Sequence, residues 1–186
     1  MYRDRSEEYS VPGKRNELLV TTRKGRGNTV SAINNDKSAL MQDDTTYVNG
    51  DPCTNIKTGD TYYIVAQQRS TDAIRCQLRK TNCTVDIVRV KKHYTGAKQD
   101  YDFEEPLFAK VTAFYEDVSG KMQQFDASLV SKATRRFLVP KLDFKLMDRI
   151  KINGTNAQIE VINASSYPGL LSVQTSNDVR VTKVIP

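Results

Sequence analysis

Residues 61–66 read Thr-Tyr-Tyr-Ile-Val-Ala, and the turn pair Gly59-Asp60 directly precedes them. Aromatic and β-branched side chains fit the pleated surface of a sheet, whereas Gly and Asp favour turns. The stretch therefore predicts a central β-strand. Because neighbouring side chains on a strand point to opposite faces, at least one of Tyr62 and Tyr63 must point into the core.

Short runs of the same kind recur at intervals of about ten residues, with turn residues between them and no convincing long helix. The strongest hairpin signal is Asn153-Gly154, which lies between two such runs. Further strands are expected at residues 74–79, 84–90, 108–115, 122–125, 136–140, 150–152, 158–162 and 170–175. The pattern predicts an all-β fold, a small β-barrel or sandwich.

Residues 1–40 differ from the rest, because they contain three glycines and scattered Lys and Arg without a sustained apolar period. We expect an extended basic arm that becomes ordered on a partner protein. Residues 3–9 are a candidate short helix that ends before Pro12. The candidate anchors of this arm are Tyr2, Tyr9 and Leu18. A disordered terminus is the alternative.

Residues 41–186 are expected to form the β-rich barrel domain, with 41–98 and 99–186 as two candidate lobes. A chain of 186 residues is long enough to bury a core, and its net charge of +6 attracts acidic surfaces or polyanions. The start of the chain does not resemble a signal sequence, and no window approaches the length of a membrane span. We therefore expect folding in a cytoplasm and no membrane partner.

The sequence offers little for catalysis. Cys53, Cys76 and Cys83 lack the close pairs of a metal site or a disulfide framework, so we expect free thiols. The only histidine, His93, lies in a basic tract with no nucleophile motif beside it. We expect no enzyme activity, no cofactor and no metal. A hydrolase that uses His93 is the weakest alternative.

Charge is segregated along the middle of the chain. Basic residues come first, at Arg75, Arg79, Lys80, Arg89, Lys91 and Lys92, and acidic ones follow, at Asp100, Asp102, Glu104 and Glu105. This order suits identical subunits that meet head to tail, the basic surface of one against the acidic counter-surface of the next. Alternatively, the basic residues face duplex DNA through its phosphates, or are ordinary surface charges.

Five short stretches together carry a family resemblance. They are residues 2–9, 59–65, 78–83, 148–154 and 167–171, among them Gly59-Asp60-Thr61-Tyr62-Tyr63-Ile64-Val65 and Asp148-Arg149-Ile150-Lys151-Ile152-Asn153-Gly154. In this order they resemble head–tail connector proteins of tailed bacteriophages. The closest type is the head-closure, or stopper, protein of the neck.

The resemblance implies a small β-barrel core in a ring of subunits below the portal, which retains packaged double-stranded DNA until a tail attaches. Its partners would be portal, tail or neck proteins and further copies of itself, in a virion assembled in the host cytoplasm. A head–tail adaptor or a tail terminator of the same assembly is an alternative. A nucleic-acid-binding β-barrel is another, since exposed tyrosines stack on bases.

Overall fold

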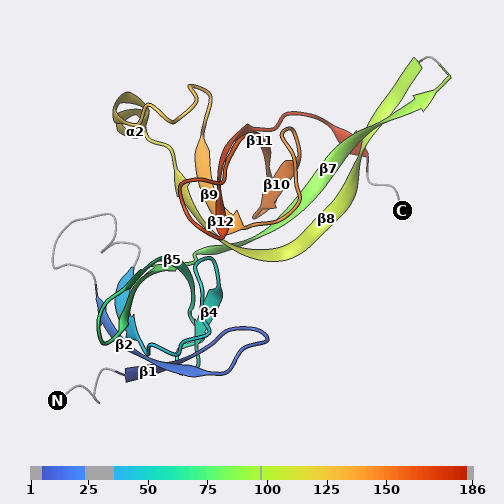
Figure 1. Ribbon diagram of the computed structural model, residues 1–186. Helices are drawn as coiled ribbons and strands as arrows, with labels where there is room; N and C mark the ends of the chain where they lie inside the picture. Colours follow the sequence, from blue (N-terminus) through green and yellow to red (C-terminus); the bar gives the residue numbers. More distant parts are fainter. Residues whose placement is uncertain (1–5, 24–35, 97, 184–186) are drawn as a thin grey trace. The chain divides into compact units, whose positions relative to one another are not determined.

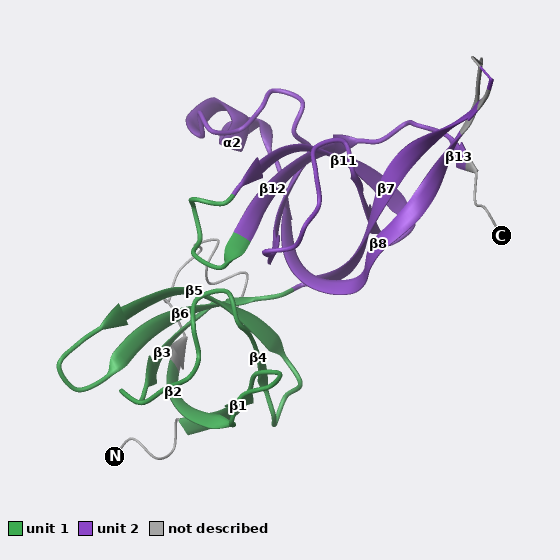
Figure 2. Cartoon of the chain, turned by 45° about the vertical axis from the view of Figure 1, so that its right-hand side comes forward, with its two compact units in different colours: residues 1–81, 164–170 green, residues 82–163, 171–186 purple. Residues whose placement is uncertain are grey.

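The computed structural model describes residues 6–23, 36–96 and 98–183 (Figure 1). Strands account for 58% of the chain and helix for 4%, and the strands form two closed six-stranded antiparallel barrels. The prediction of an all-β barrel fold is thus confirmed. The chain divides into two compact units, of which the first holds residues 1–81 and 164–170 and the second holds the remainder (Figure 2).

The barrel of the first unit has the strand order β1-β2-β3-β6-β5-β4 and closes where β1 pairs with β4. Its strands are β1 (Ser6–Ser10), β2 (Glu17–Arg23), β3 (Lys37–Met41), β4 (Pro52–Asn55), β5 (Thr61–Arg69) and β6 (Ile74–Lys80). The predicted strands at 61–66 and 74–79 are therefore present as β5 and β6. All ladders are antiparallel, as in a barrel formed from hairpins.

Tyrosines fill much of the first barrel. The rings of Tyr9 and Tyr62 meet edge to face with their centroids 6.1 Å apart. The hydroxyl of Tyr47 donates a 2.7 Å hydrogen bond to the backbone carbonyl of Tyr9, so its buried polar end is satisfied. Tyr62 and Tyr63 are both buried, which exceeds the prediction that at least one of them points inward.

The expectation of an extended arm over residues 1–40 is wrong for the described part of that segment. Strands β1, β2 and most of β3 lie within it, and residues 6–10, placed partly in a candidate helix, form β1. Tyr9 is fully buried in the barrel core, so it is no anchor for a partner, whereas Leu18 is 58% exposed on β2. Tyr2 lies outside the described residues. Strand β1 lacks a sequence signal because it buries only Tyr9 and is otherwise polar.

The second unit contains a sheet in the order β13-β8-β7-β10-β11-β12-β9, and pairing of β8 with β9 closes six of these strands into a barrel. The elements are β7 (Cys83–Thr95), β8 (Lys98–Asp117), α2 (Gly120–Phe125), β9 (Arg135–Pro140), β10 (Arg149–Ile152), β11 (Thr155–Asn163), β12 (Leu170–Asn177) and β13 (Thr182–Lys183). Aliphatic and aromatic side chains such as Ile87, Phe137 and Ile150 form its core.

Two local predictions in the second unit had different outcomes. The Asn153-Gly154 hairpin is confirmed, because both residues have positive φ (47° and 77°) and connect β10 to β11. The strand expected at residues 122–125 is wrong. Ser119 instead caps a short helix, its Oγ accepting a hydrogen bond from the Met122 backbone N–H.

The candidate lobe boundary between residues 98 and 99 is also wrong, because it would cut the turn of a continuous hairpin. Strands β7 and β8 pair from Cys83↔Ala113 to Thr95↔Lys98. The chain instead passes from one unit to the other between Thr81 and Asn82, and again on either side of residues 164–170. The ends of β7 and β8 near their turn extend well beyond the second barrel, toward the upper right of Figure 1.

A close backbone contact in the first unit predicts a specific sensitivity to substitution. A Cβ on Gly50 would lie 2.6 Å from the carbonyl oxygen of Gly169, whereas one on Gly13 would meet nothing within 4 Å. Both residues have positive φ. We expect Gly13→Ala to cost about 1–2 kcal/mol through backbone strain alone. Gly50→Ala should cost about 3 kcal/mol or more, because the backbone must also move.

Urea unfolding followed by circular dichroism measures both free energies of unfolding. Equal losses for Gly50→Ala and Gly13→Ala would contradict this close contact as a constraint on the first unit.

Candidate functional site

The six basic residues proposed as one surface are divided between the two units. Strand β6 of the first unit carries Arg75, Arg79 and Lys80, and strand β7 of the second carries Arg89, Lys91 and Lys92. The structure therefore gives two separate basic groups, one on each barrel. Neither group spans more than one strand.

Most of these cations have a partner within the chain. Ion pairs join Arg79 to Asp36 at 3.1 Å, Lys80 to Asp60 at 2.8 Å, Arg89 to Asp148 at 2.9 Å and Lys91 to Glu105 at 2.8 Å. Arg75 and Lys92 are exposed, and neither has an ion pair among the described residues. Each unit thus offers one exposed basic side chain of the predicted set that forms no ion pair with a described carboxylate.

The β7–β8 hairpin explains why basic residues precede acidic ones in the sequence. Its register places Arg89 opposite Glu105 and Lys92 opposite Asp102, so the two charge runs become cross-strand neighbours of one chain. The side chain of Asp100 lies outside the described residues. Because Lys91 and Glu105 already pair at this hairpin, their charges do not require a second subunit.

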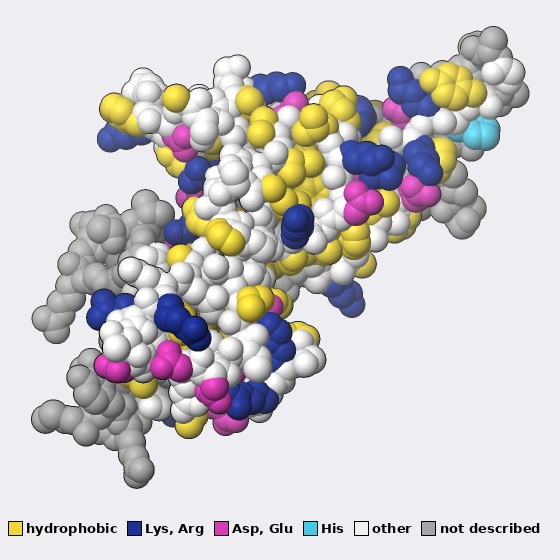
Figure 3. Space-filling model, viewed as in Figure 1, with side chains coloured by type: hydrophobic (Ala, Val, Ile, Leu, Met, Phe, Trp, Pro, Cys, Tyr) yellow, Lys and Arg dark blue, Asp and Glu magenta, His cyan; other side chains and the backbone are white. Residues whose placement is uncertain are grey.

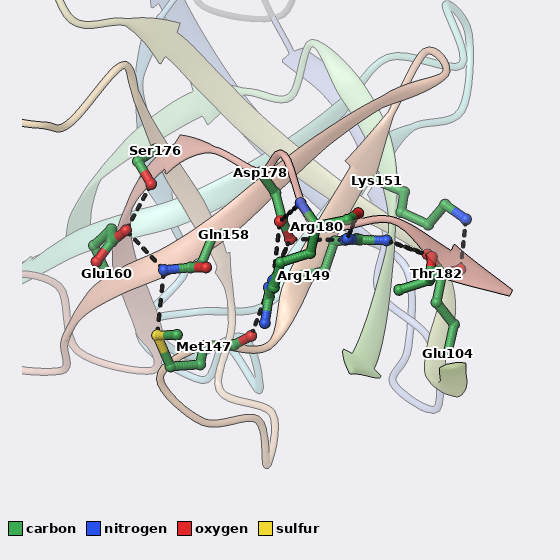
Figure 4. Close-up of polar contacts among 10 residues, drawn as sticks. All are labelled: Glu104, Met147, Arg149, Lys151, Gln158, Glu160, Ser176, Asp178, Arg180 and Thr182. Atoms are coloured by element: carbon green, nitrogen blue, oxygen red, sulfur yellow. Dashed lines mark hydrogen bonds and ion pairs between the residues drawn. The ribbon is translucent and has the colours of Figure 1, made fainter. Parts of the chain in front are cut away.

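Glu104 faces a buried arginine of its own unit, so its expected role in an acidic counter-surface is not supported. Arg149, on β10, has a fully buried side chain. It forms ion pairs with Glu104 and, at 2.8 Å, with Asp178, whose side chain is also buried (Figure 4). Lys151 binds the other oxygen of Glu104 at 2.7 Å. A buried charge requires such partners, because desolvation alone is costly.

The same arginine holds the segment that follows β12. Its Nη2 donates to the backbone carbonyl of Arg180 at 2.8 Å, and its Nη1 donates to Thr182 Oγ1 at 3.0 Å. Arg180 in turn pairs with Asp178 at 2.6 Å. Residues 178–182 are therefore fixed by their inward side chains, while Val179 and Val181 remain almost wholly exposed. We identify this cluster as a structural lock of the second unit.

Hydrogen bonding controls the ionisation of these carboxyl groups. Burial alone raises the pKa of Asp178, but hydrogen bonds from Arg180 and Arg149 outweigh it and hold the pKa well below the ordinary value. For Glu104, burial again raises the pKa, and hydrogen bonds from Lys151, Thr182 and Arg149 produce a net decrease. Both groups are therefore carboxylates at neutral pH.

The cysteines are free, and their surroundings do not favour nucleophilic chemistry. Burial raises the pKa of Cys76 and of Cys83 to about 12, and it raises that of Cys53 as well. The reactive thiolate is thus scarce at neutral pH. His93 lies on the exposed part of β7. Within the described ranges, no group of three or more His, Cys, Asp or Glu side chains is placed to bind a metal ion.

Exposed apolar side chains are the surface feature that the sequence reasoning missed. Phe125 at the end of α2 is 86% exposed, and Leu146 and Met147 are each more than half exposed. Hydrophobic side chains also gather over the second barrel in the view of Figure 3. On the first unit, a groove of about 520 Å³ is lined by residues of β2, β3, β5 and β6, among them Leu40 and Arg75.

Comparison with protein-family models and with curated proteins gives no match for this chain. The resemblance to phage connector proteins therefore rests on the short sequence motifs alone. No helix among the described residues is both long and apolar enough to cross a membrane.

The buried cluster predicts a large cost for removing its central cation. Arg149→Met removes one of the two cationic partners of both Asp178 and Glu104 and breaks the buried network that joins them, so we expect a loss of about 3–5 kcal/mol in the free energy of unfolding. Lys91→Met breaks an exposed pair with Glu105 and should cost about 0–1 kcal/mol. Urea titrations of the two variants measure the difference. Similar costs would show that Arg149 is not the lock of this unit.

The lowered carboxyl pKa values predict acid sensitivity. The unfolded chain takes up these protons at a higher pH than the folded chain, so the stabilisation is present at neutral pH and is lost as pH falls from about 5 to 2. Asp178→Asn should therefore lower stability at pH 7 and flatten its decrease in acid. The exposed Asp143→Asn is the control. Parallel stability–pH curves for wild type and Asp178→Asn would refute this assignment.

Proposed function

We propose that this protein is a structural subunit that works by assembling with other protein subunits. The observation that carries the proposal is the outer part of the β7–β8 hairpin. Among the described residues, β10 pairs with β7 only at residues 86–88, and β13 pairs with β8 only at 102–103. The described residues nearest the turn pair only across the hairpin. Because an isolated two-stranded ribbon is marginally stable in water, this projection is suited to a partner.

The specific assembly that we propose is the neck of a tailed bacteriophage particle. The chain would form a head-closure ring between portal and tail, retain the packaged DNA and provide the surface to which the tail attaches. The resemblance of residues 59–65 and 148–154 to head-closure proteins supports this role, as do the two β-barrels. A head–tail adaptor or tail terminator would use the same features.

A nucleic-acid-binding barrel is less well supported. Tyr62 and Tyr63 are buried, so they are not available to stack on bases. Four of the six candidate phosphate-binding cations are paired with carboxylates. The exposed apolar side chains favour protein contacts instead, although isolated ones are common on any surface.

Light scattering on the full chain at low and high salt tests the proposal. We expect either a ring-sized oligomer or a monomer that binds purified portal rings. Because the contacts are expected to be apolar, the measured mass or the binding to portal rings should not change with salt concentration. A variant in which an Asn-Gly turn replaces residues 93–101, between the register partners Lys92 and Asp102, should keep both barrels, as judged by circular dichroism, and lose assembly. A monomer that ignores portal rings and binds DNA in a strongly salt-dependent way would overturn the proposal.

A further inference from the structure

The connection between β8 and β9 displays an aromatic side chain on a short helix. None of the residues of α2 is buried, and Phe125 at its end is 86% exposed. Figure 1 shows α2 projecting from the second barrel. A helix without a fully buried residue gains little from packing on its own unit, so its position depends mainly on polar contacts.

Those polar contacts hold the connection firmly. Gln174 is buried on β12; its Oε1 accepts from the Val130 backbone N–H at 2.8 Å, and its Nε2 donates to the Ser128 carbonyl at 2.7 Å. Asp126, next to Phe125, pairs with Arg136 at 3.1 Å. An exposed aromatic ring on a fixed loop loses little conformational entropy on binding, which is the property of an interface anchor.

The first barrel carries a groove that suits such an anchor. Cross-strand register aligns Val20, Leu40, Arg75 and Gln68 in one row over four strands. They lie on the outer face, since Ala39, the neighbour of Leu40, points into the core. The volume of about 520 Å³ lies within the range of about 300–1,000 Å³ typical of ligand pockets.

We propose that Phe125 of one copy of this chain occupies the groove on the first barrel of a second copy. The inference rests on the assembly function proposed above and names the partner. The chemistry of the two surfaces agrees: Arg75 in the groove is exposed without an ion pair among the described residues, and a guanidinium binds the face of an aromatic ring.

The contact is heterologous, because the two surfaces that meet are different patches of the same chain. Each copy then has one free anchor and one free groove, so contacts continue from copy to copy until a ring closes or a filament grows. Loss of either surface on every copy stops assembly. When one copy lacks the anchor and a second copy lacks the groove, the anchor of the second copy can still bind the groove of the first, so one contact remains between them.

This property gives the test. Phe125→Ser removes the anchor, and Leu40→Glu removes the apolar groove, with Arg75→Glu as a second groove variant in case Leu40→Glu fails to fold. Val179→Ser, at another exposed apolar residue of the second unit, is the control. Circular dichroism and the thermal midpoint check folding, and light scattering gives the mass of each full-length variant alone and mixed.

We expect the wild type and Val179→Ser to assemble and each anchor or groove variant to remain a monomer, with self-association weakened about 30-fold or more. An equimolar mixture of Phe125→Ser with a groove variant should form dimers and nothing larger. Two results would refute the contact between Phe125 and the groove but leave the proposed assembly function intact: equal assembly of the wild type and all variants, or a mixture that stays monomeric.

A wild type that never self-associates would also refute this contact. The proposed assembly function would fail only if that monomer also did not bind portal rings.

Discussion

The antiparallel pairing of β7 with β8 is the interaction on which the second unit depends. One end of the hairpin lies in the barrel, where β10 pairs with β7 and β9 pairs with β8. The other end leaves the barrel as a two-stranded ribbon. The same register brings the basic residues of one strand beside the acidic residues of the other. One ladder therefore sets the barrel wall, the projection and the local neutralisation of charge.

The strands that could be predicted are those that carry a dense apolar or aromatic signal. Residues 61–66 and the Asn153-Gly154 hairpin are examples, because local propensity and burial agree there. Strand β1 could not be predicted, since Tyr9 is its single buried residue and the closure with β4 is a long-range contact. Helix α2 was missed because Met122 and Phe125 look like strand residues when the Ser119 cap is not weighed.

The candidate site residues, like the strands, could be predicted only in part. Composition identified the charged residues, but sequence order alone could not show that Glu104 would face Arg149, which lies far along the chain. Cross-strand register and barrel closure decide such partners, and both depend on tertiary structure. The features that our proposals assign to partner binding are exposed apolar side chains, a groove on the first barrel and the outer part of the β7–β8 hairpin. The buried thiols of Cys53 and Cys76 retain their protons at neutral pH, so they are poor nucleophiles.

The lock around Arg149 also has a consequence for the order in which the two barrels form during synthesis. All six strands of the first barrel lie before residue 81, so its ladders can close while the second unit is still being translated. Arg149 must wait for Asp178 and Thr182 to emerge from the ribosome. Until then a cation destined for the interior has only part of its counter-charge. A chain stopped between these points would carry a formed first barrel beside a second one that is exposed to proteases and chaperones.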